Sequence, residues 1–120
     1  MHELGIAQGI LEIVRQYVPE VQAADVRAVR VRVGELSGVV PDSLDFCFGA
    51  IVADTAYRGA FLAIEHVPTR CRCGACGREF SVDRLVFACP DCGSPRVDLM
   101  AGRELQVVEV ELDEARAEAP

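Results

Sequence analysis

Residues 73–93 read CGACGREFSVDRLVFACPDCG and contain two matched Cys-x-x-Cys-Gly motifs. Each cysteine pair can bind one side of a metal ion, and two such pairs complete a tetrahedral shell of thiolates. Twelve residues separate the pairs, which is close to the usual spacing in zinc ribbons. The motifs therefore predict a zinc site with four ligands: Cys73, Cys76, Cys89 and Cys92. Because the protein would fill every coordination position, we expect this zinc to be structural.

The same four cysteines allow two other interpretations. Ordinary surface or buried thiols would not be expected to recur as two matched motifs. Iron binds a similar arrangement in rubredoxin-like electron carriers. Those carriers usually surround the iron with aromatic residues, whereas this chain has no Trp and both Tyr residues lie outside the segment. Zinc is therefore favoured, and it would supply folding free energy to a segment that is poor in apolar residues.

Several neighbouring residues complete the expected cysteine segment. Gly77 and Gly93 allow a positive φ after each pair, so that backbone N–H groups can turn toward the sulfurs. Cys71 lacks the motif spacing and is interpreted as a spare thiol, and Cys47 as a core residue. We expect a small apolar lid against the metal site from three residues: Phe80, Leu85 and Phe87.

Outside this segment, periodic patterns predict two helices and three strands. Residues 4–18 carry apolar side chains at helical spacing, and residues 29–33 alternate strictly as in a half-buried strand. A second helix is predicted from Pro41, with Asp42 or Ser43 able to cap it. Further strands are predicted over two ranges, 61–67 and 104–112.

This order of elements predicts an α+β fold. Two helices would pack on a three-stranded sheet, and a zinc-ribbon or rubredoxin-like module with four cysteine ligands would be inserted between the last two strands. The predicted domains are an α+β domain, residues 1–69 and 100–120, and a zinc-binding module, residues 70–99. The acidic, alanine-rich tail at 113–120 is expected to be frayed.

Composition restricts the compartment and the partners. The chain has 120 residues, a formal net charge of −7 and no Lys, so it would repel phosphate backbones, which argues against nucleic acid. Its start has no secretory pattern, and the apolar stretch at 46–53 is too short to span a bilayer. We therefore expect no membrane association and a cytoplasmic location. Thiols stay reduced there, so the six cysteines are interpreted as ligands and core residues.

The first residues offer a second metal site of a different kind. The amine of Met1 together with the amide nitrogen and imidazole of His2 can chelate one cation through fused rings, and the Glu3 amide or a side chain could complete a square plane. Nitrogen-rich, square-planar geometry suits Ni(II) or Cu(II). Because any chain that begins Met-His has this pattern, the pattern alone is not specific.

Nearly the whole chain resembles the HypA/HybF family of hydrogenase nickel-incorporation proteins. The resemblance is carried by the paired cysteines and by these motifs: MHELGIA (1–7), LEIV (11–14), VGELS (33–37), PDSLDF (41–46) and LAIE (62–65). It implies that His2 anchors nickel with the Met1 amine and Glu3 as helpers, and that the four motif cysteines hold zinc. It also suggests Asp42 as a weaker candidate near the nickel.

The resemblance implies a nickel metallochaperone rather than an enzyme. Such a protein would pass Ni(II), with a maturation GTPase, to the large-subunit precursor of a [NiFe] hydrogenase, and in some organisms would also serve urease. It would be a monomer or a homodimer. No Ser-His-Asp set or phosphate-binding glycine loop supports catalysis. The alternatives are a zinc-ribbon adaptor, which would require a basic face, and a rubredoxin-like electron carrier.

Overall fold

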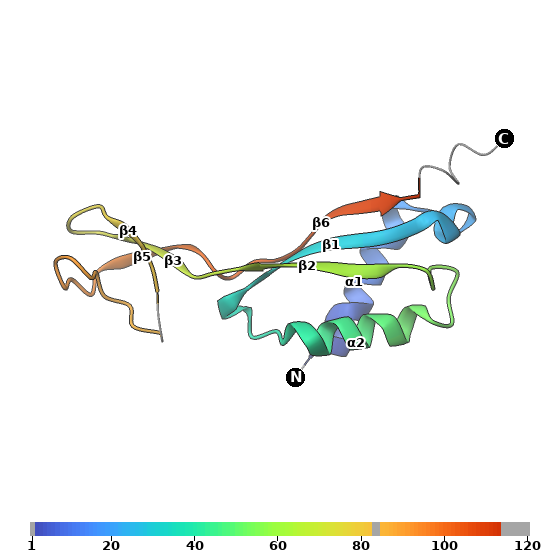
Figure 1. Ribbon diagram of the computed structural model, residues 1–120, viewed down its shortest axis with the longest axis horizontal. Coiled ribbons are helices and arrows are strands. Elements are labelled where there is room, and N and C mark those ends of the chain that lie inside the picture. The colour runs from blue at the N-terminus through green and yellow to red at the C-terminus, as the bar shows by residue number, and fades with distance from the viewer. Residues whose placement is uncertain (1, 83–84, 114–120) are drawn as a thin grey trace.

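The computed structural model describes residues 2–82 and 85–113 of the chain. Figure 1 shows a helix-covered sheet from which a smaller cysteine-bearing module projects. The helix-covered part, here called the core domain, contains α1 (Glu3–Tyr17), β1 (Val26–Gly34), α2 (Pro41–Val52), β2 (Phe61–Val67) and β6 (Leu105–Leu112). Two short 3-10 helices flank β1: η1 (Glu20–Asp25) and η2 (Glu35–Ser37). The module contains β3 (Arg70–Cys73), β4 (Glu79–Ser81) and β5 (Val97–Ala101).

The core sheet has the strand order β2-β1-β6. Strand β1 runs parallel to β2 and antiparallel to β6. Helix α2 makes the crossover between the two parallel strands, as parallel pairing requires. Along β1, valines are buried and arginines are exposed in alternation, so one face of the sheet is buried and the other is exposed to solvent. This confirms the half-buried strand predicted from residues 29–33, and the strand extends three residues further toward the N-terminus.

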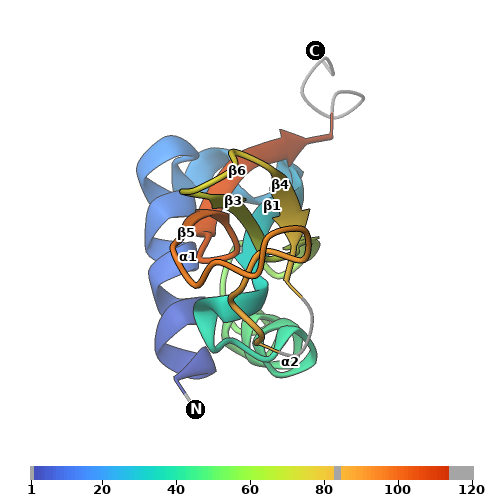
Figure 2. The same cartoon turned by 90° about the vertical axis from the view of Figure 1, so that its left-hand side faces the viewer.

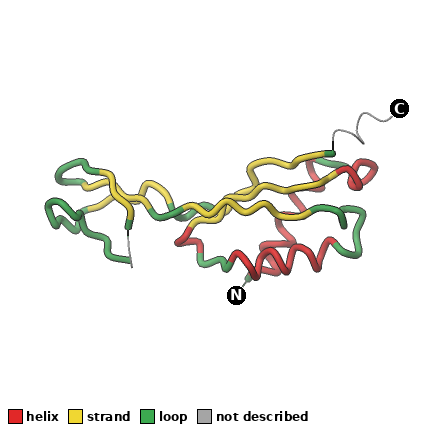
Figure 3. Tube along the Cα trace, viewed as in Figure 1, coloured by secondary structure: helices red, strands yellow, loops and turns green. Residues whose placement is uncertain are grey.

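Both helices pack their apolar side chains against the buried face of the sheet. Figure 2 shows α1 and α2 crossing steeply, and Figure 3 traces the same layers in the view of Figure 1. Leu44 and Phe48 of α2 are almost completely buried, and each contributes roughly 1.5–3 kcal/mol through burial. Tyr57 is equally buried, and its hydroxyl donates a hydrogen bond to the Val18 carbonyl at 2.6 Å. These packed layers confirm the α+β fold class.

The start of α2 differs from the expectation of a side-chain cap. The N-cap residue is Val40, which has no capping side chain, and Pro41 occupies the first turn. The Val40 N–H donates instead to a carboxylate oxygen of Glu3 in α1, at 3.1 Å. The expectation that Asp42 or Ser43 would cap α2 was therefore wrong, because the helix begins at Pro41 and both residues lie inside its first turn.

The module is a small antiparallel sheet of order β4-β3-β5. Cys71 on β3 is paired with Phe80 on one side and Leu99 on the other. Among the described residues, its core consists of four buried residues, Cys71, Cys73, Phe80 and Cys89, with partly buried neighbours around them. So few buried side chains supply little hydrophobic stabilisation, which agrees with a module that requires a metal.

A joint that we call the neck (residues 34–36, 68–70 and 101–104) connects the core domain to the module. Gly34 donates its N–H to the Glu104 carbonyl, and Leu36 donates to the Gly102 carbonyl, both at 2.7 Å. An added Cβ on Gly34 would lie 2.2 Å from the Gly102 oxygen, so only glycine fits there. The Glu35 carboxylate accepts hydrogen bonds from both the hydroxyl and the amide of Thr69. The neck is therefore a tightly bonded joint.

Two further expectations concern the C-terminal tail and helices that could span a membrane. The predicted frayed tail at 113–120 lies outside the described residues except for Asp113, whose N–H donates to the Asp25 carbonyl at 2.7 Å. None of the helices within the described residues is long and apolar enough to cross a membrane.

Candidate metal sites

The four motif cysteines converge on one point in the module. Their sulfur atoms all lie within 4.8 Å of one another. Two pairs are closer: Cys73 and Cys92 are separated by 3.5 Å between sulfurs, and Cys76 and Cys89 by 3.6 Å. A tetrahedral zinc with Zn–S bonds of about 2.3 Å would separate its sulfurs by about 3.8 Å. The geometry therefore fits one tetrahedral ion bound by four thiolates.

Two turns of the same type build this cluster. Gly77 and Gly93 adopt φ values of 79° and 74°, which non-glycine residues rarely adopt. Each glycine N–H donates to the carbonyl of the first cysteine of its pair, at 3.0 Å for Cys73 and 2.8 Å for Cys89. The predicted positive φ after each cysteine pair is thus confirmed, and the repeated turn explains why the two pairs face each other with matching geometry.

Backbone amides stabilise negative charge on the first sulfur of each pair. The N–H groups of Ala75 and Cys76 point at the Cys73 sulfur, at 3.3 and 3.4 Å. The Cys76 N–H is the main reason that the pKa of Cys73 falls to about 6. The Cys92 N–H likewise lowers the pKa of Cys89. These two buried sulfurs are therefore prepared to act as thiolate ligands.

The second cysteine of each pair behaves in the opposite way. The Ser94 N–H acts to lower the pKa of Cys92, but the bond to the opposite sulfur, together with burial, outweighs it and raises the pKa to about 11. The Arg78 N–H acts in the same direction on Cys76, and again the opposite sulfur and burial raise the pKa. Without a metal, four sulfurs this close cannot all be ionised, so the cluster needs a cation to neutralise them.

The surroundings of the cluster correct part of the expected apolar lid. Phe80 is buried in the module core, but Leu85 is 67% exposed and Phe87 is 38% exposed. Of the three residues expected to form the lid, Phe80 alone belongs to the buried core of the module among the described residues. Cys71 lies beside Phe80, outside the sulfur cluster, and burial raises the pKa of its thiol. Cys47 is partly buried against the core of the larger domain.

The second candidate site lies where α1 begins, beside the start of α2 (Figure 1). His2 is exposed and is the N-cap residue of α1, with its carbonyl accepting the Ile6 N–H at 2.9 Å. Glu3 is only 3% exposed. Hydrogen bonding to the amino-terminal group, followed by that to the Val40 N–H, lowers the pKa of Glu3 to about 2. Met1 lies outside the described residues.

The sequence-predicted nickel residues therefore occupy different environments. The imidazole of His2 is accessible to solvent, whereas the carboxylate of Glu3 is buried and bonded to α2. Asp42 is exposed in the first turn of α2, two residues beyond the amide that Glu3 binds. The Glu3–Val40 bond, which sequence reasoning missed, brings His2 and Asp42 to the same end of the helix pair. No periodic signal links residues that are 37 positions apart.

Comparison with known proteins finds relatives along nearly the whole chain. A family model described as hydrogenase/urease nickel incorporation, metallochaperone, HypA matches residues 1–112. The hydrogenase maturation factor HypA of Streptomyces avermitilis is 50% identical over 123 residues, which cover 99% of this chain and 92% of that protein. The factor of the same name from Desulfosudis oleivorans is 44% identical, with 95% of this chain and all of that protein covered.

Solved structures show the same fold. The solution structure of the Ni metallochaperone HypA from Helicobacter pylori matches with a TM-score of 0.62 and 22% identity, covering 93% of this chain and 97% of that one. A second structure, described as the solution structure of HypA protein, matches with a TM-score of 0.66, also at 22% identity, covering 93% and 96% of the two chains. At this level of identity the likeness concerns the fold.

Proposed function

Because this chain belongs to the HypA family of hydrogenase/urease nickel-incorporation metallochaperones, we propose that it carries Ni(II) at its amino terminus and delivers it during maturation of a [NiFe] hydrogenase. Urease is a second recipient within the same family description. In this proposal the four-cysteine module holds a structural Zn(II), and the chain itself carries out no catalysis.

The accessibility of His2 carries the proposal. A carrier needs a site that binds its cargo and yet exchanges ligands with a recipient. His2 is exposed at the first turn of α1, so its imidazole can meet both a metal and a partner. We assign His2 as the anchor, with the Met1 amine and Glu3 as helpers and Asp42 as a further candidate beside them. Nitrogen ligands in a square plane suit Ni(II).

The burial of Glu3 refines how that residue would help. Its carboxylate accepts the Val40 N–H and is almost inaccessible, so we propose that it holds the start of α1 against α2 and contributes to nickel through its backbone amide. This amide belongs to the first residue of α1 and follows His2 directly in the chain. Glu3 would then orient His2, which is itself the ligand.

The cysteine cluster would serve stability. Four thiolates at tetrahedral separations leave no open position for exchange, which supports a zinc ion that stays bound while nickel passes through. We keep the division into a nickel-binding domain (1–69 and 100–120) and a zinc-binding module (70–99) as part of this proposal. The proposed partners are a hydrogenase maturation GTPase and the hydrogenase large-subunit precursor, met in the cytoplasm.

Nickel titration by calorimetry tests the proposal. The native chain, with zinc bound and nothing added before Met1, should bind one Ni(II). His2→Ala removes the imidazole, and a chain extended by one residue before Met1 removes the terminal amine from the chelate. Each change should weaken nickel binding at least about a hundredfold, because each removes one nitrogen from a fused chelate.

Zinc content is the matched control, since both altered chains should keep one zinc per chain. If nickel binds all three chains equally, the terminal site is wrong, and a zinc-ribbon adaptor becomes the better description. Red protein that contains iron would instead indicate a rubredoxin-like electron carrier.

A further inference from the structure

Strand β6 leaves one edge of the core sheet open. Among the described residues, β6 is hydrogen-bonded to β1 alone, so the outward N–H and C=O groups of its other edge have no strand beside them. An open edge of this kind is a template for an added strand. A bulge at Val108, where the register with β1 shifts, divides this edge into two short straight segments.

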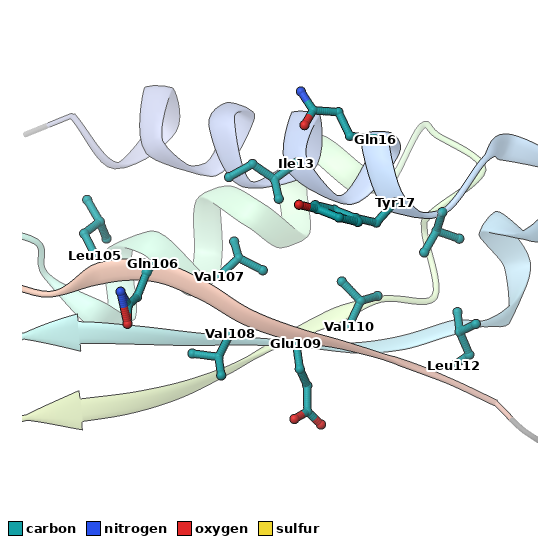
Figure 4. A pocket seen from close by; sticks show the side chains of 11 residues that line it. Ile13, Gln16, Tyr17, Leu105, Gln106, Val107, Val108, Glu109, Val110 and Leu112 are labelled. Carbon is teal, nitrogen blue, oxygen red and sulfur yellow. The ribbon is translucent and has the colours of Figure 1, made fainter.

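An apolar groove of about 830 Å³ runs along this edge, between β6 and α1. Figure 4 shows Ile13 and Tyr17 of α1 pointing down toward Val107 and Val110, which point up from β6. Tyr17 is 77% exposed. A strand added beside β6 would place every second side chain under α1, in this groove.

Charge on the opposite face of the sheet continues in a regular pattern across the strands. Glu65 on β2 pairs with Arg32 on β1 at 3.4 Å. On the other side of β1, Arg27 and Arg30 meet Glu111 on β6 at 3.2 and 3.4 Å. The arginines of β1 are thus flanked by Glu65 on β2 and by Glu109 and Glu111 on β6. The next strand beyond β6 would therefore be favoured by basic side chains, because opposite charges on neighbouring strands attract.

We propose that the free edge of β6 binds an extended segment of a partner protein in which apolar and basic residues alternate. The apolar side chains would enter the groove under α1, and the basic ones would lie beside Glu109 and Glu111. Glu109 is half exposed, and its carboxylate lies 3.9 Å from the Arg30 guanidinium. This separation is long for an ion pair, so the carboxylate can accept a second cation. The proposal is independent of both metal sites.

A second copy of this chain fits the edge poorly. Pairing β6 with another β6 would bring the two acidic rows, each with Glu109 and Glu111, onto neighbouring strands. Such like charges repel, and the net charge of −7 adds to the repulsion. The observations therefore favour a basic segment of a different protein.

Binding of a synthetic peptide to the full chain tests this proposal. The probe is a capped peptide of alternating valine and arginine with the length of β6, labelled for fluorescence anisotropy. Its control alternates valine and glutamate. The arginine peptide should bind at least about threefold more tightly than the glutamate peptide, and hydrogen exchange should slow at β6 amides.

Three variants locate the site. Glu109→Arg should weaken the arginine peptide about threefold to tenfold, and Tyr17→Ser should weaken both peptides by removing a wall of the groove. Glu65→Arg makes the same charge change at the opposite edge of the sheet, on β2, and should have no effect. Thermal unfolding checks that all three variants stay folded.

Several outcomes would overturn the proposal. It fails if neither peptide binds, if the glutamate peptide binds as well as the arginine peptide, if Glu65→Arg weakens binding as much as Glu109→Arg, or if exchange slows at β2 in place of β6. Loss of nickel binding has no bearing on it, so failure here is distinguishable from failure of the carrier function.

Discussion

The cysteines of the metal cluster differ in how tightly they hold a proton, although their sulfurs lie within 4.8 Å of one another. Backbone N–H groups lower the pKa of Cys73 to about 6 and also lower that of Cys89. The outer sulfurs, Cys76 and Cys92, retain their protons at neutral pH, because the opposite sulfurs and burial outweigh the amides beside them. A metal ion must displace those protons in order to bind all four sulfurs.

We predict that zinc binding to the metal-free chain at pH 7 releases at least about two protons, from Cys76 and Cys92. The affinity should then fall at least about a hundredfold for each pH unit lost, because every released proton contributes tenfold. Calorimetry in two buffers with different ionisation enthalpies measures the number directly. Release of fewer than one proton would show that the cluster is already ionised, contrary to the raised pKa values.

Two glycines illustrate how local space decides a substitution. A Cβ on Gly34 would lie 2.2 Å from the backbone oxygen of Gly102, whereas a Cβ on Gly49 would meet nothing within 4 Å. Gly34→Ala should cost about 3 kcal/mol or prevent folding. Gly49→Ala, in the exposed part of α2, should stabilise the chain by about 0.5–1 kcal/mol. Urea unfolding measures both, and equal effects of the two changes would contradict the close approach at the neck.

At the scale of elements, the neck depends on the carboxylate of Glu35, which joins two segments that are far apart in the sequence. The hydroxyl of Thr69 and then its amide lower the pKa of Glu35. A lowered folded-state pKa means that the stabilising effect is present above the unfolded-state pKa, and is lost as pH falls through the folded-state value. The neck should therefore be strongest at neutral pH.

We predict that Glu35→Gln lowers the melting temperature at pH 7, and that the difference from the native chain narrows as pH falls below about 4.5, where the native carboxylate also becomes protonated. Thermal unfolding followed by circular dichroism across pH 3.5–7 measures this. Glu12→Gln, on the exposed face of α1, is the control and should leave the curve unchanged. A difference that stays constant with pH would mean that the charge of Glu35 does not support the neck.

Periodic patterns predicted the larger elements but not the contacts that join them. The strand over residues 61–67 was predicted with its observed bounds, since alternation and Pro68 mark both ends. The short strands of the module were not predicted, because three to five residues carry too little periodicity. The cysteine cluster followed from motif spacing, whereas the bonds Glu3–Val40 and Glu35–Thr69 join residues whose proximity only the folded chain creates.

At the scale of the whole molecule, the two proposed metal sites lie in differently built parts. The cysteine cluster lies in a module with few buried residues, and the amino terminus lies on a core domain with many. The neck separates them (Figure 1). One site is closed and made of sulfur, and the other is exposed and offers nitrogen and oxygen. A chain built in this way can keep one metal while it exchanges another.

X-ray absorption at the zinc and nickel edges of the chain loaded with both metals tests this separation most directly. We predict four sulfur ligands around zinc, at about 2.3 Å, and a nickel shell of nitrogen and oxygen that includes an imidazole and no thiolate. In His2→Ala the imidazole signal at nickel should disappear while the zinc spectrum stays the same. Thiolate sulfur around nickel in the native chain would contradict the account, because it would place the cargo in the cysteine cluster.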